Sequence, residues 1–262
     1  VLMNKIAAML GKTTDAVKYA AWASYVKQAF NKAYYHPETK QYGSGSQTSN
    51  AIAVSFGLVN VKEKAAVIEN IVKEIQQRNY SLTSGDIGFH HLLKVLYEAG
   101  RSDVIYLMNN RNDVPGYGYQ IAKGATALTE SWLAAPIVSN NHFMLGHLME
   151  WFYAGLAGIQ QSKTSVGYKE IEIKPEVAGD ITNAKATFQS PYGLIKSEWT
   201  KSVIAFNLQV EIPANSTAVV HIPAKNGQTV LQNGKKATVV YVNGRAVVKI
   251  GSGNYEFSVE NN

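Results

Sequence analysis

The spacing of apolar residues changes part-way along this chain, and that change constrains the fold more than any other feature. In the first part, apolar residues recur every three or four positions, as over 67–75, which is typical of helices. Later they alternate with polar residues, as over 204–210, which is typical of strands. We therefore predict an α+β chain of two domains, with helices over 1–160 and an antiparallel β-sandwich over 161–262.

Further stripes at helical spacing support roughly seven helical segments in the first domain. Their apolar positions are Tyr19, Trp22, Val26, Ala29 and Phe30; Val67, Ile68, Ile71, Val72 and Ile75; Ile87, Leu92, Val95, Leu96 and Ala99; and Leu148, Trp151, Phe152, Gly155, Leu156 and Ile159. Between 47 and 58 a weakly charged segment predicts a buried helix, and Gly100 is typical of a helix C-cap.

In the second domain, alternation assigns one face of each predicted strand to the core. The residues on those faces are Ile171 and Ile173; Ala184, Ala186 and Phe188; Ile204, Phe206, Leu208 and Val210; Val219 and His221; and Tyr255, Phe257 and Val259. Asn-Gly pairs at 226–227, 233–234 and 243–244 predict tight turns between antiparallel strands, because both residues tolerate positive φ.

Composition excludes several classes of function. The net charge is +6, but 1–160 carry 14 Lys and Arg against 11 Asp and Glu, and 161–262 carry 11 against 8, so each part is +3. Without a basic cluster we expect no nucleic-acid partner. There is no cysteine, which excludes disulfides and thiolate metal sites. No apolar run is long enough to predict a membrane span.

The sequence begins directly in a helical pattern, without the features of a signal peptide. Together with the small number of predicted helices, this start indicates a cut made inside a larger protein. Periplasmic or secreted localisation in a bacterium is the compartment we favour, although nothing within the chain determines it.

The helical pattern lapses between about 112 and 141, and this stretch holds the residues best suited to chemistry. Glu130 and Trp132 lie in Gly124-Ala-Thr-Ala-Leu-Thr-Glu130-Ser-Trp132, and His142 follows in an Asn-His pair. A long connection inside a helical domain is usually functional. Aromatic faces pack on the C–H surfaces of sugars, and carboxylates activate water, so this combination favours work on a sugar ring.

These motifs, with others spread along the chain, resemble the α-L-rhamnosidases of glycoside hydrolase family 78. The matching segments are Gly43-Ser-Gly-Ser-Gln47-Thr48 with Asn50, Leu82-Thr83-Ser84-Gly85-Asp86-Ile-Gly88, Glu98-Ala-Gly100-Arg-Ser-Asp103, Gly118-Tyr119, the Glu130 motif, and Asn141-His142 with Gly146, Glu150, Trp151 and Gly158. The resemblance implies an (α/α)₆ toroid followed by a C-terminal β-sandwich. About half of the twelve toroid helices are readable here, so the chain is expected to be the C-terminal half.

The resemblance also implies roles for individual residues. Members of the family invert the anomeric centre, and the position of their general base corresponds to Glu130. His142 corresponds to a sugar contact, and Tyr117 to the aromatic lining of the sugar subsite. Trp132 is expected to face the sugar because it lies in the irregular segment beside Glu130. Thr129 and Tyr117 stand where the family often has Trp, a variation in that lining. The general acid lies upstream in the family, outside this chain.

Other polar and aromatic residues are interpreted as structural. Asp86 suits the N-terminal dipole of a helix, and Glu150 a hydrogen-bonded position among apolar neighbours. His147 and Glu150 lack a second histidine, so we predict no metal site and no cofactor. Trp199 and Tyr192 are expected in packing rather than in a carbohydrate platform, and no function is assigned to His90 and His91.

Three functions remain for such a chain. The first is part of an inverting glycoside hydrolase that releases terminal α-L-rhamnose from a glycoside or polysaccharide. The second is a non-catalytic carbohydrate-binding or scaffolding module with a degenerate site. The third is a toroidal lyase using Tyr119 and His142, which is disfavoured because Arg111 stands alone where a uronate would need several arginines. The expected partner is a carbohydrate, and the protein could form a homodimer.

Overall fold

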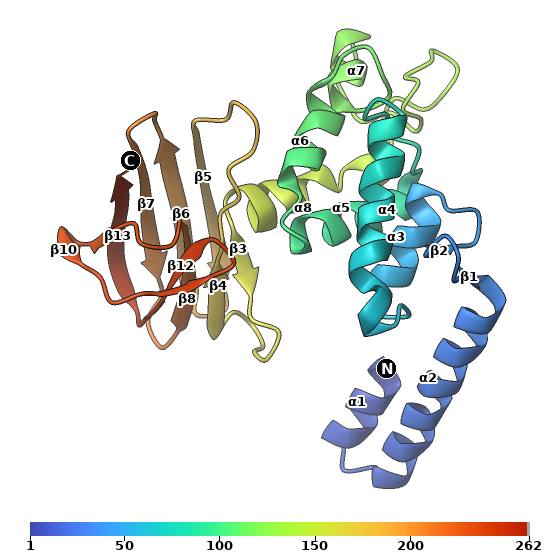
Figure 1. The fold of residues 1–262 in the computed structure, drawn as a ribbon, viewed down its shortest axis with the longest axis horizontal. Coiled ribbons are helices and arrows are strands. Elements are labelled where there is room, and N and C mark those ends of the chain that lie inside the picture. The colour runs from blue at the N-terminus through green and yellow to red at the C-terminus, as the bar shows by residue number, and fades with distance from the viewer. Residues whose placement is uncertain (261–262) are drawn as a thin grey trace. The chain divides into compact units, whose positions relative to one another are not determined.

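The computed structural model describes residues 1–260 and shows helices followed by strands, the order predicted from the sequence (Figure 1). Eight α-helices and thirteen strands are formed by the described residues. The chain divides into two compact units, 1–95 and 96–262. Each unit is considered by itself below.

The first unit begins with a helical hairpin, α1 (Leu2–Met9) and α2 (Thr13–Tyr34), followed by the short strands β1 (Tyr35–His36) and β2 (Gln41–Tyr42). Three helices follow: α3 (Gln47–Ser55), α4 (Lys64–Gln77) and α5 (Asp86–Glu98), whose end lies in the second unit. A 3₁₀ turn, Val61–Glu63, precedes α4. The predicted stripe on α4 is confirmed, because Val67, Ile71, Val72 and Ile75 are buried.

Several of the motifs quoted above have a structural role in this unit, because their polar side chains are buried and hydrogen-bonded. The amide of Gln47 accepts from the Thr83 backbone N–H at 3.1 Å and donates to the Ser81 carbonyl at 3.0 Å. The Asn50 Oδ1 accepts from the Tyr42 N–H at 2.8 Å. A Cβ on Gly88 would overlap the side chain of Thr48, so only glycine lets α5 approach α3 here. These motif residues therefore hold loops and helices together.

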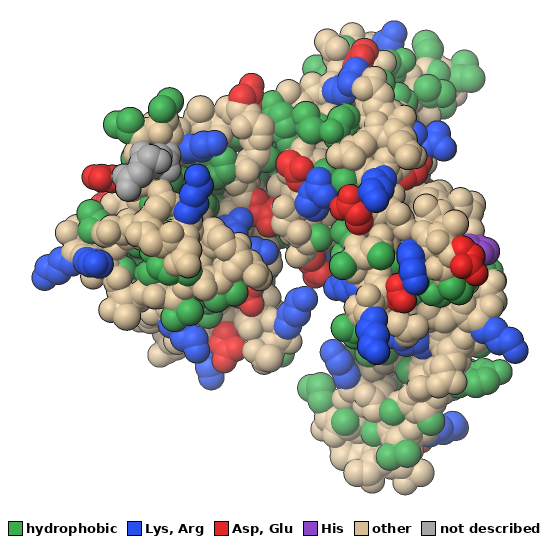
Figure 2. Space-filling view, viewed as in Figure 1, with side chains coloured by type: hydrophobic (Ala, Val, Ile, Leu, Met, Phe, Trp, Pro, Cys, Tyr) green, Lys and Arg blue, Asp and Glu red, His purple; other side chains and the backbone are tan. Residues whose placement is uncertain are grey.

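Helix α2 departs from the prediction of a core-facing stripe. None of its 22 residues, all within the described part of the chain, is buried, and Trp22 is 58% exposed. Polar contacts hold α2 in place, including Asn31 Nδ2 to the Leu58 carbonyl at 2.8 Å. An amphipathic helix normally gains its stability by burying such a face. Figure 2 shows hydrophobic side chains on the surface of this hairpin.

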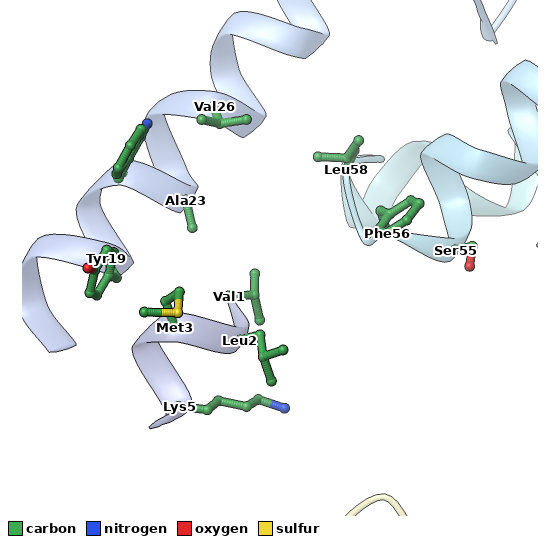
Figure 3. A pocket seen from close by; sticks show the side chains of 11 residues that line it. Val1, Leu2, Met3, Lys5, Tyr19, Ala23, Val26, Ser55, Phe56 and Leu58 are labelled. Atoms are coloured by element: carbon green, nitrogen blue, oxygen red, sulfur yellow. The ribbon is translucent and has the colours of Figure 1, made fainter. Parts of the chain in front are cut away.

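A cavity of about 680 Å³ lies beside the same hairpin. In the close view of Figure 3, Val1, Leu2 and Met3 lie opposite α2, and Phe56 and Leu58 form the remaining wall. Apart from Lys5, Tyr19, Trp22 and Ser55, its lining side chains are wholly hydrocarbon or thioether. This cavity, called the α1–α2 groove below, therefore has an apolar lining with few groups that could orient a small ligand.

The helical part of the second unit consists of α6 (Ser102–Asn110), α7 (Tyr117–Ala122) and α8 (Leu148–Trp151). A 3₁₀ turn at Phe143–Leu145 precedes α8, and a π-helical turn at Phe152–Leu156 follows it. Two predictions were wrong here: the lapse in helical pattern contains α7, and Ile159 belongs to a strand rather than to the last helix. Gly100 ends α5 at φ +72°, confirming the predicted C-cap.

The remaining strands form two sheets. One has the order β10-β9-β13-β7-β6-β5 and the other β11-β12-β8-β4-β3. Their bounds are β3 Ile159–Gln161, β4 Glu170–Ile173, β5 Asn183–Ser190, β6 Gly193–Lys201, β7 Ala205–Ile212, β8 Thr217–Pro223, β9 Val230–Gln232, β10 Lys235–Lys236, β11 Val240–Val242, β12 Arg245–Ile250 and β13 Gly253–Glu260. Paired strands are antiparallel except β4 and β8, which run parallel.

Both sheets contribute to one hydrophobic core. Trp199 of β6 and Phe257 of β13 pack with Ile173 of β4 and Val220 of β8, and all four are fully buried. The core position predicted for Trp199 is confirmed, and its indole N–H donates to the Leu156 carbonyl at 2.8 Å. The predicted antiparallel sandwich is thereby confirmed, with the β4–β8 pair as its exception.

Two details of the strand prediction and one of the helix prediction were wrong. Along β8 the buried residues are Ala218, Val220 and Ile222, so Val219 and His221 lie on the opposite face. Ile204 precedes β7 and is 73% exposed, because the strand begins one residue later. In the helical part, Ile87 is exposed at the start of α5. In β8 the whole alternation is shifted by one residue, whereas Ile204 and Ile87 lie at the ends of their elements, where a periodic pattern does not fix burial.

Two of the three predicted Asn-Gly turns have the expected backbone. Asn233 and Gly234 join β9 to β10 with φ of +50° and +74°, and Asn243 and Gly244 join β11 to β12 with φ of +50° and +72°. Positive φ at both central residues defines the hairpin turn that suits twisted strands. At the third turn only Gly227 has positive φ.

A buried carboxylate links α6 and α8 to the start of the sandwich. Glu176, 4% exposed, accepts a hydrogen bond from the Ser102 hydroxyl, and that hydroxyl accepts from the Trp151 indole N–H at 2.8 Å. The Glu176 backbone N–H donates to the Gly155 carbonyl at 3.0 Å, and Lys174 Nζ lies 3.7 Å from Oε1. This Glu176 cluster was not anticipated from the sequence.

We expect Ser102→Ala to lower the free energy of unfolding by about 1–3 kcal/mol, because it leaves a buried carboxylate oxygen and an indole N–H without their partner. Tyr106→Phe is the matched control: it removes another hydroxyl-to-carboxylate bond, to Asp180, but an exposed one. We expect the control to cost less than about 1 kcal/mol. Urea unfolding of both variants measures the difference, and equal losses would contradict the importance of the buried cluster.

Gly158 provides a second test of the same junction. Its φ is +78°, and an added Cβ would overlap the backbone of Lys174 and Pro175. We expect Gly158→Ala to destabilise the chain by about 3 kcal/mol or more, from backbone strain together with steric overlap. Gly244→Ala is the control, since its φ of +72° is similar but its surroundings are open. That substitution is expected to cost about 1–2 kcal/mol in the same unfolding measurement.

Candidate active site

Glu130 and His142 lie on two segments that run beside each other. The Glu130 N–H donates to the Ser139 carbonyl at 2.9 Å, and the His142 N–H donates to the Leu128 carbonyl at 2.8 Å. These bonds close a loop over 131–138 and bring together residues that the sequence separates. The structure thus places the predicted carboxylate and imidazole on adjacent backbone segments.

The loop is positioned by a buried threonine. Thr129 is fully buried, and its hydroxyl donates to the Ser131 carbonyl at 2.6 Å. Two backbone turns follow, with Ala134 N–H to the Ser131 carbonyl at 3.0 Å and Val138 N–H to the Ala135 carbonyl at 3.1 Å. Ala134 has φ of +48°, a conformation that costs a non-glycine residue about 1–2 kcal/mol. Thr129 therefore occupies a structural position directly before Glu130.

The Glu130 carboxylate itself is exposed to solvent. Its Oε2 accepts a hydrogen bond from the Ser139 N–H at 3.2 Å. His142 is half-buried and directly precedes the 3₁₀ turn at Phe143–Leu145. A carboxylate held by one backbone bond keeps lone pairs available for water or for a sugar hydroxyl. The side chain is thus positioned for contact with a ligand, but this chain alone does not enclose it.

The two predicted aromatic residues form a pair. The rings of Trp132 and Tyr117 are 5.6 Å apart at 61°, an edge-to-face contact. Trp132 is 8% exposed, and burial raises the pKa of Tyr117 to about 12. The indole therefore packs mainly against protein, and Tyr117 stays protonated at any physiological pH. The structure joins these two residues through α7, an element that the sequence reading missed.

Tyr117 also lines a cavity of about 710 Å³ between α6, α7, α8 and the loop before β5. The cavity walls include Tyr106, Trp151 and Phe152, with Asn109 and Asp180 among the polar residues. Glu130, Trp132 and His142 are not part of its lining. The predicted site residues therefore divide between an exposed loop and a separate cavity.

Glu150 occupies the structural position predicted for it. It is half-buried, and its Oε1 accepts a hydrogen bond from the Tyr97 hydroxyl at 2.8 Å. Burial and this bond raise the pKa of Tyr97 well above its usual range. Within residues 1–260, no group of three or more His, Cys, Asp or Glu side chains is arranged to hold a metal ion. None of the helices in that range is both long and apolar enough to cross a bilayer.

Family models match almost the whole of the described chain. The bacterial alpha-L-rhamnosidase six-hairpin glycosidase domain matches residues 1–156, and the bacterial alpha-L-rhamnosidase C-terminal domain matches residues 158–237. The chain belongs to the bacterial alpha-L-rhamnosidase family of glycoside hydrolases. The resemblance stated from the sequence motifs and the predicted fold class are both confirmed by these matches.

Relatives of known name agree with this membership. An alpha-L-rhamnosidase of Streptomyces avermitilis is 32% identical over 98% of this chain and 25% of its own length. One from Formosa agariphila is 29% identical over 99% of this chain and 30% of its own length. The chain thus spans about a quarter to a third of the length of these curated relatives.

Solved structures resemble the chain closely. The alpha-L-rhamnosidase from Dictyoglumus thermophilum has a TM-score of 0.90 and 30% identity, covering 98% of this chain and 30% of that protein. The Streptomyces avermitilis enzyme, solved as a complex with L-rhamnose, has a TM-score of 0.89 and 32% identity, covering 98% of this chain and 25% of that protein.

Because its carboxylate is exposed, we expect Glu130→Gln to change the free energy of unfolding of this chain by less than about 0.5 kcal/mol. The glutamine carbonyl can still accept from the Ser139 N–H. Trp132 lies two residues further along the chain but is buried, and Trp132→Ala is expected to cost about 3 kcal/mol. Thermal unfolding compares the two variants. A large loss of stability for Glu130→Gln would contradict the exposed position of this side chain.

Proposed function

We propose that the chain is the C-terminal part of an inverting glycoside hydrolase that releases terminal α-L-rhamnose. The proposal rests chiefly on one observation: backbone hydrogen bonds hold the segments of Glu130 and His142 side by side in a member of the alpha-L-rhamnosidase family. In this proposal residues 1–160 are the C-terminal part of the catalytic toroid, and 161–262 are the β-sandwich domain.

Glu130 is the proposed general base. Its carboxylate would take a proton from a water molecule as that water attacks the anomeric carbon from the face opposite the leaving group. The Ser139 N–H that binds Oε2 would fix the orientation of the carboxylate and leave Oε1 to face the water. His142 and Trp132 would hold the sugar, the imidazole by a hydrogen bond to a hydroxyl and the indole by the 8% of its surface that is exposed.

The second catalytic group is proposed to lie outside this chain. In an inverting enzyme a carboxylic acid protonates the leaving oxygen at roughly 6.5–9.5 Å from the base, with the water between the base and the sugar. Support for an external acid comes from the exposure of Glu130 and from the length of the relatives, of which the chain spans about a quarter to 30%. The 262 residues alone are expected to have no hydrolytic activity.

A decisive measurement is hydrolysis of an aryl α-L-rhamnoside by a full-length protein that contains this chain. We expect Glu130→Gln to lower kcat about a hundredfold to ten-thousandfold, because an amide cannot accept the proton. Glu38→Gln changes an exposed glutamate elsewhere and should keep full activity. Proton NMR of the first product should show the inverted anomer. Undiminished hydrolysis by Glu130→Gln would refute the assignment.

The second candidate is a carbohydrate-binding or scaffolding module without catalysis. The exposure of the Glu130 carboxylate favours it, since a base facing bulk water lacks the enclosure in which catalysis is effective. Calorimetry of the isolated chain with L-rhamnose separates the two candidates. A binding module should bind the sugar by itself, with affinity reduced by His142→Ala, whereas part of a hydrolase site should show no saturable binding.

A further inference from the structure

The threonine directly before Glu130 makes a hydrogen bond across it. The Thr129 hydroxyl donates to the Ser131 carbonyl at 2.6 Å, so the two residues that flank Glu130 are joined to each other. Thr129 is fully buried, and a hydrogen bond is stronger in such surroundings than in water. The backbone on both sides of Glu130 is therefore restrained by one short bond.

The acceptor of that bond is also the start of the loop over 131–138. The Ser131 carbonyl accepts a second hydrogen bond, from the Ala134 N–H at 3.0 Å, which closes the first turn of the loop. Ala134 has φ of +48°, a conformation that is unfavourable for a residue with a side chain. Such a turn persists only where its surroundings determine it. The Thr129 hydroxyl supplies part of that restraint by fixing the carbonyl on which the turn is built.

The other end of the loop holds the Glu130 carboxylate. The Ser139 carbonyl accepts from the Glu130 N–H at 2.9 Å, and the Ser139 N–H donates to Glu130 Oε2 at 3.2 Å. Exposed side chains otherwise change rotamer rapidly, so the second bond restricts the directions that the carboxylate can face. The orientation of the carboxylate thus depends on where the loop places Ser139.

His142 is restrained by a different bond. Its N–H donates to the Leu128 carbonyl at 2.8 Å, and Leu128 lies before the residues joined by the Thr129 hydroxyl. Loss of that hydroxyl should therefore disturb the Glu130 loop more than the segment of His142. The two predicted site residues can be separated experimentally on this ground.

We propose that Thr129 is a positioning residue for the Glu130 carboxylate and acts through the Ser131 carbonyl and the loop that ends at Ser139. The inference rests on the proposed function, in which Glu130 is the general base. Thr129 itself is fully buried and contacts neither water nor sugar. Its hydroxyl determines the direction from which Oε1 meets the attacking water, and a misplacement of about 1 Å can lower a rate about a hundredfold.

Ser197 is the matched control for a purely structural role. It is also fully buried, and its hydroxyl donates to the Ala157 carbonyl at 2.6 Å. It lies in β6 of the sandwich, outside the Glu130 loop. Thr129→Val and Ser197→Ala each remove one buried hydroxyl-to-carbonyl bond, so their losses of stability should be comparable. Only the first substitution should alter the loop.

The first measurement is hydrolysis of an aryl α-L-rhamnoside by a full-length protein that contains this chain. We expect Thr129→Val to lower kcat about tenfold to a hundredfold, with a smaller change in KM because His142 stays in place. Thr129→Ser keeps the hydroxyl and should keep kcat close to that of the unchanged protein. Ser197→Ala should also keep kcat. Thermal unfolding verifies that each variant is folded at the assay temperature.

The second measurement is hydrogen–deuterium exchange of the same proteins, which reports on the loop without any catalysis. The amides of 130–139 should exchange faster in Thr129→Val and at an unchanged rate in Ser197→Ala. Unchanged exchange or unchanged kcat in folded Thr129→Val would overturn the proposal, as would an equal loss of kcat in Ser197→Ala.

Glu130→Gln distinguishes a failure of this proposal from a failure of the proposed function. Full activity of Glu130→Gln would overturn the proposed function and, with it, the catalytic role of Thr129. Loss of activity in Glu130→Gln together with full activity in Thr129→Val would overturn the role of Thr129 alone. Loss of activity in both, with faster exchange over 130–139 in Thr129→Val, is the result that we expect.

Discussion

The carboxylate of Glu176 determines how the helices of the second unit meet its strands. Burying a charge is costly, and here the cost is offset by the Ser102 hydroxyl and by Lys174 at 3.7 Å. The same hydroxyl accepts from Trp151, so one cluster fixes the start of α6 and the end of α8. Tyr106 and Trp151, which extend from these two helices, then become fixed walls of the large cavity. The hydrogen bonds of the Glu176 cluster thus fix both the start of the strands and the walls of that cavity.

Arg245 and His221 of the sandwich also stabilise the junction between the helices and the strands of the second unit. Arg245 of β12 donates to the carbonyls of Pro175 at 2.8 Å and His221 at 3.3 Å. Burial, followed by the charges of Arg245 and Lys174, lowers the pKa of His221 to about 4. His221 therefore stays neutral at neutral pH, and the positive charge of Arg245 is balanced by Glu176 and the carbonyls rather than opposed by a second cation. Residues 174–176 are therefore bonded to α6 through Glu176 and to β12 through the Pro175 carbonyl.

Much of the architecture could be predicted from the sequence because it depends on local patterns. The change of apolar period, the α4 stripe and the Asn-Gly turns each follow from the chemistry of neighbouring residues. The phase of β8 could not be predicted, since Val219 and Val220 are equally apolar and only the facing sheet determines which is buried. The Glu176 cluster joins residues 74 positions apart, a pairing that no local pattern carries.

The candidate site was predictable to a similar degree. Glu130 and His142 could be proposed as neighbours from motif and resemblance, and backbone hydrogen bonds do bring their segments together. The burial of Trp132 against Tyr117 depends instead on α7, a six-residue helix. Gly116 directly precedes that helix and Gly118 lies within it. In a sequence such glycines predict the absence of a helix, but in the fold they permit close packing on α6. Glycine therefore disfavours a helix by its local propensity but favours this one by allowing its backbone to approach α6.

Two cavities in the described part of the chain show why volume alone does not identify a ligand site. They are nearly equal, at about 680 and 710 Å³. The α1–α2 groove is lined mainly by hydrocarbon side chains such as Leu2 and Val26, which favour any apolar surface of matching shape and impose no orientation. The cavity beside α6 is lined by polar as well as apolar side chains, and among them Asn110, Tyr106 and Asp180 are joined by hydrogen bonds. Polar groups held in this way form hydrogen bonds only in defined directions, so the chemistry of a lining limits the possible ligands more than the volume does.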